Sequence, residues 1–124
     1  ESYCRLGSDK APLYVTWSAE NRSQLIRIPA AVGEYRRAEL RSADPMTNPY
    51  IAYTLLIYAG MYGLEHDLQL CPASDFNVYT APAEVLDGLE KLPASLPEAA
   101  ALAEASAFIR RHLPEAVISA YCRP

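Results

Sequence analysis

The side chains that could carry chemistry are mostly arginines, and they gather near the N-terminal end of the chain. The 124 residues include nine arginines but only two lysines, and six of the arginines lie within the first 41 residues. A planar guanidinium group can bind a carboxylate or a phosphate through two parallel hydrogen bonds, whereas a lysine ammonium acts as a point charge. An arginine-rich segment of this kind therefore suits the recognition of an anion.

Three charged side chains share one face of a strand that the sequence predicts at residues 35–41. Side chains alternate across a strand, so Arg37, Glu39 and Arg41 lie on the same face. The alanine and the leucine between them take the opposite face, which suits a core. The polar face thus carries a positive, a negative and a positive charge in turn.

A neighbouring predicted strand adds further guanidinium groups, from Arg27 and from Arg22 at its entrance. The charge pattern alone favours a solvated, salt-bridged sheet surface, because exposed ion pairs are common and contribute little to stability. The alternative is a pocket for an anionic substrate, in which Glu39 is a ligand of a hard cation such as Mg²⁺. The pattern leaves both interpretations open.

Composition and charge exclude several classes of function. The net charge of −4 and the isoelectric point near 5.1 argue against a nucleic-acid partner. Residues 1–45 carry seven basic and six acidic side chains, so the acidity lies in the remainder. The longest apolar run, residues 50–64, falls short of the roughly 20 residues that a membrane span needs. We therefore expect neither a nucleic-acid nor a membrane partner, and no stretch resembles a signal peptide.

The cysteines and histidines do not form an obvious site. Cys4, Cys71 and Cys122 are odd in number and contain no closely spaced pair, which fits free thiols in a reducing cytoplasm. We accordingly expect a cytoplasmic protein. His66 follows an apolar helix and His112 ends another, so a surface role is expected for both.

The pattern of apolar residues predicts a single α+β domain, with an antiparallel three-stranded sheet followed by about four helices. Short turns separate the strands, as in a meander. Asn48 is a good N-cap and Pro49 suits a first helical position, while Thr80 and Ser95 are candidate caps of later helices. The predicted strands are 12–18, 23–29 and 35–41, and the predicted helices are 49–64, 82–89, 96–112 and 114–121.

The expected core lies between the sheet and the first long helix. Leu13, Val15 and Trp17 share one face of the first strand. The helix at 49–64 is apolar nearly all round, so we expect it to be buried. The expected core residues are Val15, Ile26, Ile28, Leu40, Leu55, Leu56 and Leu64.

Six motifs, in order and with matching spacing, resemble the C-terminal part of the catalytic domain of glutamine synthetases. The resemblance covers essentially the whole chain and implies that the three strands belong to that family's catalytic barrel. The motifs are SYCRL at 2–6, AP at 11–12, NRS at 21–23, IRIP at 26–29, RRAELR at 36–41 and DPMTNPY at 44–50.

The resemblance implies an ATP-dependent ligase that makes glutamine from glutamate and ammonia through γ-glutamyl phosphate. Glu39 matches a ligand of the Mg²⁺ or Mn²⁺ ion beside the transferred phosphate. Arg22 and Arg27 match arginines that hold the ATP phosphates and the γ-phosphoryl group, and Arg37 matches another arginine near those phosphates. Such roles agree with phosphoryl transfer, in which cations and positioning supply most of the rate.

Further matches concern glutamate and the flap over the site. Arg5 and Arg41 match glutamate-binding arginines, and Arg22 is also expected to bind substrate. Family members carry a glutamate immediately before the Ala-Pro pair, on a flap that helps to deprotonate ammonium. Here Lys10 occupies that catalytic position, in a loop that looks one residue short. A lysine would repel ammonium, although the adjacent Asp9 could substitute in part.

The family's N-terminal β domain and earlier catalytic strands, with the other metal ligands, find no match in residues 1–124. We therefore expect a partial domain from the last third of a synthetase, inactive by itself, since one carboxylate cannot make a two-metal site. Lys10 leaves two alternatives open: a relative that joins glutamate to an amine other than ammonia, and a non-catalytic remnant that binds an anion or a partner.

The resemblance also bears on assembly. Family members stack in rings, which implies a homo-oligomeric parent. In this partial domain a sheet edge and an apolar face lose their cover, so we expect the chain to self-associate, most simply as a dimer.

Overall fold

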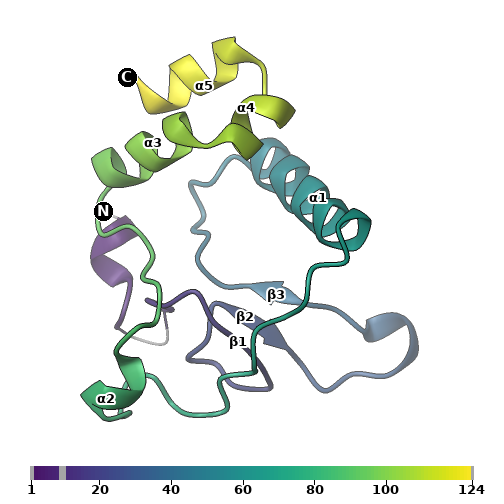
Figure 1. Ribbon diagram of the computed structural model, residues 1–124, viewed down its shortest axis with the longest axis vertical. Coiled ribbons are helices and arrows are strands. Elements are labelled where there is room, and N and C mark those ends of the chain that lie inside the picture. The colour runs from purple at the N-terminus through teal and green to yellow at the C-terminus, as the bar shows by residue number, and fades with distance from the viewer. Residues whose placement is uncertain (1, 9–10, 124) are drawn as a thin grey trace. The chain divides into compact units, whose positions relative to one another are not determined.

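The computed structural model describes residues 2–8 and 11–123, which form two compact units (Figure 1). The first unit consists of the residues up to Asp44 together with Cys71–Leu92, and it contains the sheet. The second consists of Pro45–Leu70 and the residues from Pro93 onward, and apart from its loops it is helical. The α+β class is therefore confirmed.

The sheet has three short strands in the order β1-β2-β3, namely Trp17–Ala19, Ile26–Ile28 and Glu39–Leu40. β2 and β3 are antiparallel, but β1 and β2 are parallel, with Trp17 opposite Ile26. The sheet is mixed, and the prediction of a purely antiparallel meander was wrong for its first pair.

The connection between β1 and β2 explains the parallel pairing. Glu20 has a φ of 61°, in the left-handed region, and the side chain of Asn21 accepts hydrogen bonds from the backbone N–H and the hydroxyl of Ser23, both at 2.9 Å. Residues 20–25 therefore loop back past β1 instead of forming a tight hairpin, and β2 runs in the same direction as β1.

The third strand is much shorter than the predicted 35–41. A turn of 3₁₀ helix, η2, occupies Gly33–Tyr35, and β3 contains two residues. Gly33 has a φ of 59°, which glycine adopts without steric cost. The alternation within residues 37–41 still places Glu39 opposite Arg27 of β2.

The core of the first unit lies on the face of the first strand that the sequence did not favour. Tyr14, Thr16 and Ser18 are buried, whereas Val15 is 43 % exposed. Polar residues can occupy this face because they have partners: Thr16 donates to the side chain of Gln24, and Ser18 donates to Asp75. Of the core residues that were predicted, Ile28 is also exposed. The buried hydrophobic residues of this unit are Ala11, Tyr14, Leu25 and Val78.

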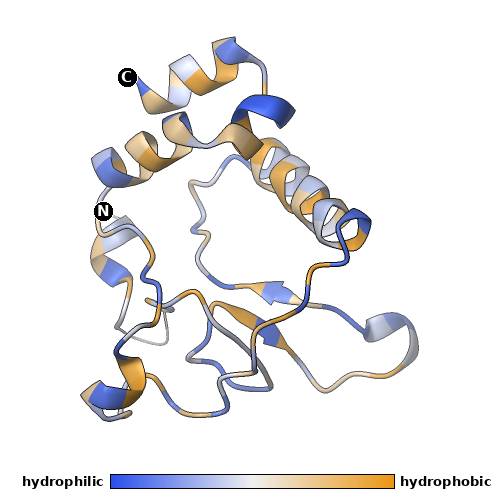
Figure 2. Cartoon of the chain, viewed as in Figure 1, coloured by the Kyte–Doolittle hydropathy of each residue, from blue (hydrophilic) through white to orange (hydrophobic). Residues whose placement is uncertain are grey.

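The long helix of the second unit, α1 at Pro49–Glu65, confirms the predicted start. Asn48 accepts hydrogen bonds from the N–H groups of Tyr50 at 3.0 Å and Ile51 at 3.4 Å, so it is the N-cap. The expected burial of this helix was wrong, because none of its residues is buried. Figure 2 shows apolar residues along much of α1.

The remaining helices are short. α2 spans Ala83–Leu86, within the predicted 82–89, and begins after Pro82 without a side-chain cap, so Thr80 is not its N-cap. The predicted helix 96–112 is two helices, α3 at Leu96–Ala105 and α4 at Ala107–His112, and the last helix, α5, spans Glu115–Cys122.

Serine caps account for the division of the predicted helix 96–112. Ser95 accepts a hydrogen bond from the N–H of Glu98 at 3.3 Å, and the Glu98 carboxylate accepts one from the N–H of Ala94 at 2.8 Å, close to the predicted capping box. Ser106 accepts a bond from the N–H of Ile109 and starts α4 as a second N-cap. No helix in the described part of the chain has the length and apolar character needed to cross a membrane.

Candidate functional site

The candidate site centres on the carboxylate of Glu39 in β3. The antiparallel register of β2 and β3 places Arg27 directly opposite it, and Nη1 of Arg27 lies 2.9 Å from Oε2. Arg37, two residues before Glu39, approaches Oε1 with Nη2 at 3.0 Å and with Nε at 3.2 Å. Both carboxylate oxygens therefore accept hydrogen bonds from guanidinium groups.

Carbonyl groups fix the two arginines in this arrangement. Nε of Arg27 donates to the carbonyl of Glu20 at 3.1 Å, and Nη1 of Arg37 donates to that of Tyr35 at 3.2 Å. The Arg27 side chain is 15 % exposed and that of Arg37 is 54 % exposed. Arg27 is thus part of the sheet, while Arg37 faces solvent.

The arginines determine the charge state of Glu39. The hydrogen bond from Arg27 lowers the pKa of the Glu39 carboxyl most, partial desolvation opposes it, and the bond from Arg37 lowers it further. The net effect is a pKa below the ordinary value, so Glu39 is ionised at neutral pH. The cluster carries two positive charges and one negative charge.

A hollow of about 430 Å³ lies beside this cluster. Its wall combines apolar side chains with two guanidinium groups, a combination that can hold an anion with an apolar part. Arg36 was not among the predicted site residues, although its position next to Arg37 in the RRAELR motif was the available signal. The lining residues are Ile28, Pro29, Ala31, Arg36, Arg37 and Ala38.

Arg22 and Arg41 come together through the backbone. Nη1 of Arg41 donates to the carbonyl of Arg22 and, at 3.0 Å, to the carbonyl of Gln24. The side chain of Arg22 is exposed at the turn before β2. The structure thus links these two predicted residues, and Arg41 holds the turn that carries Arg22.

Arg5 lies near the end of β3. Nη2 of Arg5 donates to the carbonyl of Ser42, and its buried Nε has no hydrogen-bond partner among the described residues. Arg5 is the last residue of a short 3₁₀ helix, η1, at Ser2–Arg5. Lys10 and Asp9, at the predicted flap position, lie outside the described residues.

The described residues do not fit a resident metal ion. A hard divalent cation takes about six oxygen ligands, and Glu39, the predicted ligand, has both oxygens on arginines. Within residues 2–8 and 11–123, no three side chains of His, Cys, Asp or Glu are grouped so as to hold a metal. Glu39 could become a metal ligand only by giving up an arginine and with further ligands from elsewhere.

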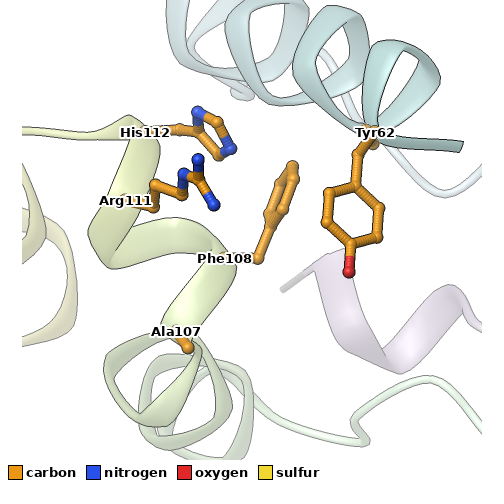
Figure 3. Close-up of a pocket in the computed structure, with 6 residues that line it drawn as sticks. Tyr62, Ala107, Phe108, Arg111 and His112 are labelled. Atoms are coloured by element: carbon orange, nitrogen blue, oxygen red, sulfur yellow. The ribbon is translucent and has the colours of Figure 1, made fainter. Parts of the chain in front are cut away.

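A second hollow, of about 480 Å³, lies in the helical unit between α1 and α4 (Figure 3). His112 stacks on Tyr58 with ring centroids 4.1 Å apart, and Phe108 lies 4.6 Å from His112. His66 stacks on Tyr62 at 3.9 Å. The four-residue spacing of Tyr58, Tyr62 and His66, and of Phe108 and His112, is the sequence pattern that indicates this cluster.

Comparisons with known proteins identify the family. A family model described as glutamine synthetase, catalytic domain, matches residues 1–124. The chain belongs to this family. The resemblance carried by the six motifs is therefore confirmed.

Individual relatives agree with this assignment. A glutamine synthetase of Methanosarcina mazei is 40 % identical over 114 residues, which are 90 % of this chain and 26 % of the relative. A glutamine synthetase of Pyrococcus furiosus is 39 % identical over 118 residues, or 93 % of this chain and 27 % of the relative. The chain thus spans about a quarter of the length of these relatives.

A solved structure extends the likeness to the fold. It is titled as a GmaS/ADP complex, shares 26 % sequence identity with this chain, and superposes with a TM-score of 0.74. The match covers 94 % of this chain and 25 % of that chain. The fold of this chain is therefore similar to that of about a quarter of that protein.

Proposed function

We propose that residues 1–124 are the C-terminal part of the catalytic domain of a glutamine synthetase-type ligase. The reaction is the ATP-dependent condensation of glutamate with ammonia through γ-glutamyl phosphate. The observation that carries the proposal is the cluster of Arg27, Arg37 and Glu39 in a chain that matches the catalytic-domain model from end to end. The N-terminal β domain and the remaining catalytic strands would lie outside these residues.

Within this function the arginines neutralise phosphate charge. Phosphoryl transfer needs fixed positive groups around the transferred oxygens, and guanidinium groups supply them without changing protonation state. Arg27 and Arg37 both bind the Glu39 carboxylate, and Arg37 also lines the hollow. Arg22 is exposed at the adjoining turn, where it could contact nucleotide phosphates. Arg5 and Arg41 are assigned to glutamate.

ATP and a divalent cation are the cofactors that the family implies for the whole protein. The matched solved structure is titled as an ADP complex, which supports a nucleotide as a ligand of the whole protein. In the whole protein Glu39 would act as one metal ligand, with the others supplied from outside residues 1–124. Because the described residues lack such a ligand set, the 124-residue chain alone should bind no catalytic metal.

One observation favours a second candidate function. Lys10 stands where a carboxylate would attract ammonium and take its proton. A ligase that joins glutamate to a larger amine, or a protein that has lost catalysis and retains anion binding, would not need that carboxylate. Both alternatives retain the arginine cluster, but the ligase would react with an amine larger than ammonia, whereas the remnant would react with none.

The test uses the protein encoded by the complete open reading frame. We expect ATP-dependent formation of a γ-glutamyl amide from glutamate and an amine, measured across ammonia and small primary amines. Glu39→Gln should abolish turnover, whereas Glu34→Gln, which removes the same charge at an exposed position in the turn before β3, should leave it unchanged. The isolated 124-residue chain should show no turnover. If the intact protein consumes no ATP with any amine, the ligase function is wrong and the non-catalytic, anion-binding alternative remains.

A further inference from the structure

We infer that the segment Cys71–Val78 holds the turn at residues 20–24 in place, and that Asn21 is thereby a positioning residue for Arg22. The inference rests on the proposed role of Arg22 as a phosphate contact and adds to it the residues that fix where Arg22 lies.

The carbonyl oxygen of Phe76 is the central contact. It accepts one hydrogen bond from Nδ2 of Asn21 at 2.9 Å and another from Nε2 of Gln24 at 2.8 Å. Two residues further on, the N–H of Val78 donates to the hydroxyl of Ser23 at 3.2 Å. The segment therefore contacts the turn on both sides of Arg22.

Because the side chains that make these hydrogen bonds are buried, losing the bonds would destabilise the turn. Gln24 has no exposed surface, and Ser23 is 4 % exposed. A buried polar group without a partner costs free energy comparable to a lost hydrogen bond or more, so the turn has few alternative conformations. The side-chain oxygen of Gln24, Oε1, accepts a hydrogen bond from the hydroxyl of Thr16.

The segment is itself fixed to β1, which makes it a rigid support. The indole N–H of Trp17 donates to the carbonyl of Cys71, and the carbonyl of Trp17 accepts from the N–H of Ser74, both at 2.8 Å. Ser18 donates to the carboxylate of Asp75 at 2.6 Å. Three successive polar contacts thus tie the segment to the sheet before it reaches the turn.

The turn connects this support to the arginine cluster. Arg22 lies between Asn21 and Ser23, and its carbonyl accepts a hydrogen bond from Arg41. The carbonyl of Glu20, immediately before Asn21, accepts from Nε of Arg27 at 3.1 Å. A shift of the turn would therefore move Arg22 and release one partner of Arg27, changing two of the groups proposed to bind phosphate.

The decisive variant is Asn21→Asp in the protein encoded by the complete open reading frame. The carboxylate keeps the acceptor for Ser23 but places an oxygen, without a donor, against the carbonyl of Phe76. We expect the dissociation constant for ATP, measured by calorimetry, to rise about tenfold or more, as for loss of one charge-assisted hydrogen bond. Asn77→Asp is the matched control: Asn77 is exposed, and its side chain accepts from the N–H of Tyr79.

A double substitution separates positioning from a merely structural role. If Asn21 acts mainly through Arg22, Asn21→Asp should lower ATP affinity less in an Arg22→Ala background than in the unmodified protein, because coupled residues are not additive and only the effect on Arg27 remains. A full additional loss of ATP affinity in that background would overturn the inference. Asn21→Ala repeats the test without the added negative charge.

Two further measurements distinguish failure of the inference from failure of the proposed function. If Arg22→Ala leaves ATP affinity unchanged, the proposed role of Arg22 is wrong. If Arg22→Ala weakens ATP binding while Asn21→Asp and Asn21→Ala do not, the positioning role is wrong. Hydrogen–deuterium exchange at residues 20–26 tests, without ligand, whether the segment Cys71–Val78 holds the turn. Unchanged protection of these amides in Asn21→Asp would overturn the inference.

Discussion

Glu39 uses both carboxylate oxygens to bind arginines, and this arrangement determines how pH acts on the sheet. Arg27 bonds one oxygen at 2.9 Å and Arg37 bonds the other at 3.0 Å. Strand alternation predicted that Arg37 and Glu39 share a face, and the β2–β3 register adds Arg27. The position of Arg41 could not be predicted in this way, because it depends on carbonyl groups 17 and 19 residues away in sequence.

The first prediction concerns the pH dependence of stability. The arginines lower the pKa of Glu39 in the folded chain, so the folded state binds its proton less readily than the unfolded state. The stability that this contributes is fully present above the ordinary glutamate pKa of about 4.3 and is lost as pH falls through the lower folded pKa. Glu39→Gln should therefore be less stable than the unmodified chain at pH 7, with a difference that shrinks below about pH 4.

Urea denaturation of the 124-residue chain at several pH values measures this difference. Glu34→Gln is the control, since Glu34 is exposed and its substitution should leave the pH profile unchanged. If the difference in the free energy of unfolding between Glu39→Gln and the unmodified chain stays constant from pH 7 to pH 3, charge pairing is not the cause of that difference.

The second prediction concerns Lys10, which lies outside the described residues. A cation at the flap position repels ammonium and cannot accept its proton, so the whole protein should be a poor ammonia ligase. Lys10→Glu should raise glutamine formation, measured as ATP-dependent turnover with ammonia, with little effect on ATP affinity. Lys10→Gln, which removes the positive charge but supplies no carboxylate, should raise glutamine formation less. If the unmodified protein already uses ammonia efficiently, Lys10 is not at the flap position.

At the scale of elements, local signals predicted the helices better than the sheet. The Asn48 and Ser95 caps are confirmed because a cap depends on a few neighbouring residues. The direction of β1 against β2 and the buried face of the first strand were wrong. The direction follows from the left-handed conformation of Glu20 in the connection. The buried face depends on side chains such as Gln24 and Asp75 finding partners far away in sequence, which no periodicity records.

The third prediction concerns the cap of α1. Asn48 accepts the first N–H groups of the helix, and its Nδ2 donates to the hydroxyl of Tyr121 in α5 at 2.7 Å. Asn48→Ala should lower the free energy of unfolding by about 1 kcal/mol for the lost cap, with a further loss for the contact with α5. Asn48→Asp retains the cap and should cost less, and Tyr121→Phe isolates the second contact. Equal losses for Asn48→Ala and Asn48→Asp would contradict a capping role.

At the scale of the whole molecule, α1 contains no buried residue and exposes several large apolar side chains. Five large apolar side chains recur every three or four positions along it, and they share one face of the helix. Tyr50, at one end of the stripe, is 84 % exposed and Leu64, at the other, is 85 % exposed. The stripe consists of Tyr50, Tyr53, Ile57, Met61 and Leu64.

The chain spans about a quarter of its relatives, so a protein of their full length has further residues that could cover such a face. In the 124-residue chain alone, water must contact the stripe. Contiguous apolar patches of this kind are uncommon on monomers and tend to pair with a partner surface. A two-fold dimer would place one stripe against another, since a self-complementary patch is the simplest closed arrangement.

The last prediction follows: the isolated chain should self-associate through α1. Sedimentation velocity over a wide concentration range should show a dimer or larger species that dissociates on dilution. Ile57→Glu combined with Met61→Glu should give a monomer, because two charges at the centre of the stripe would be desolvated and would face like charges across the two-fold axis. Val32→Glu, at a position 78 % exposed in the first unit, adds charge away from the helix and should leave association unchanged. A monomer at every concentration, or equal disruption by Val32→Glu, would show that α1 does not form the contact.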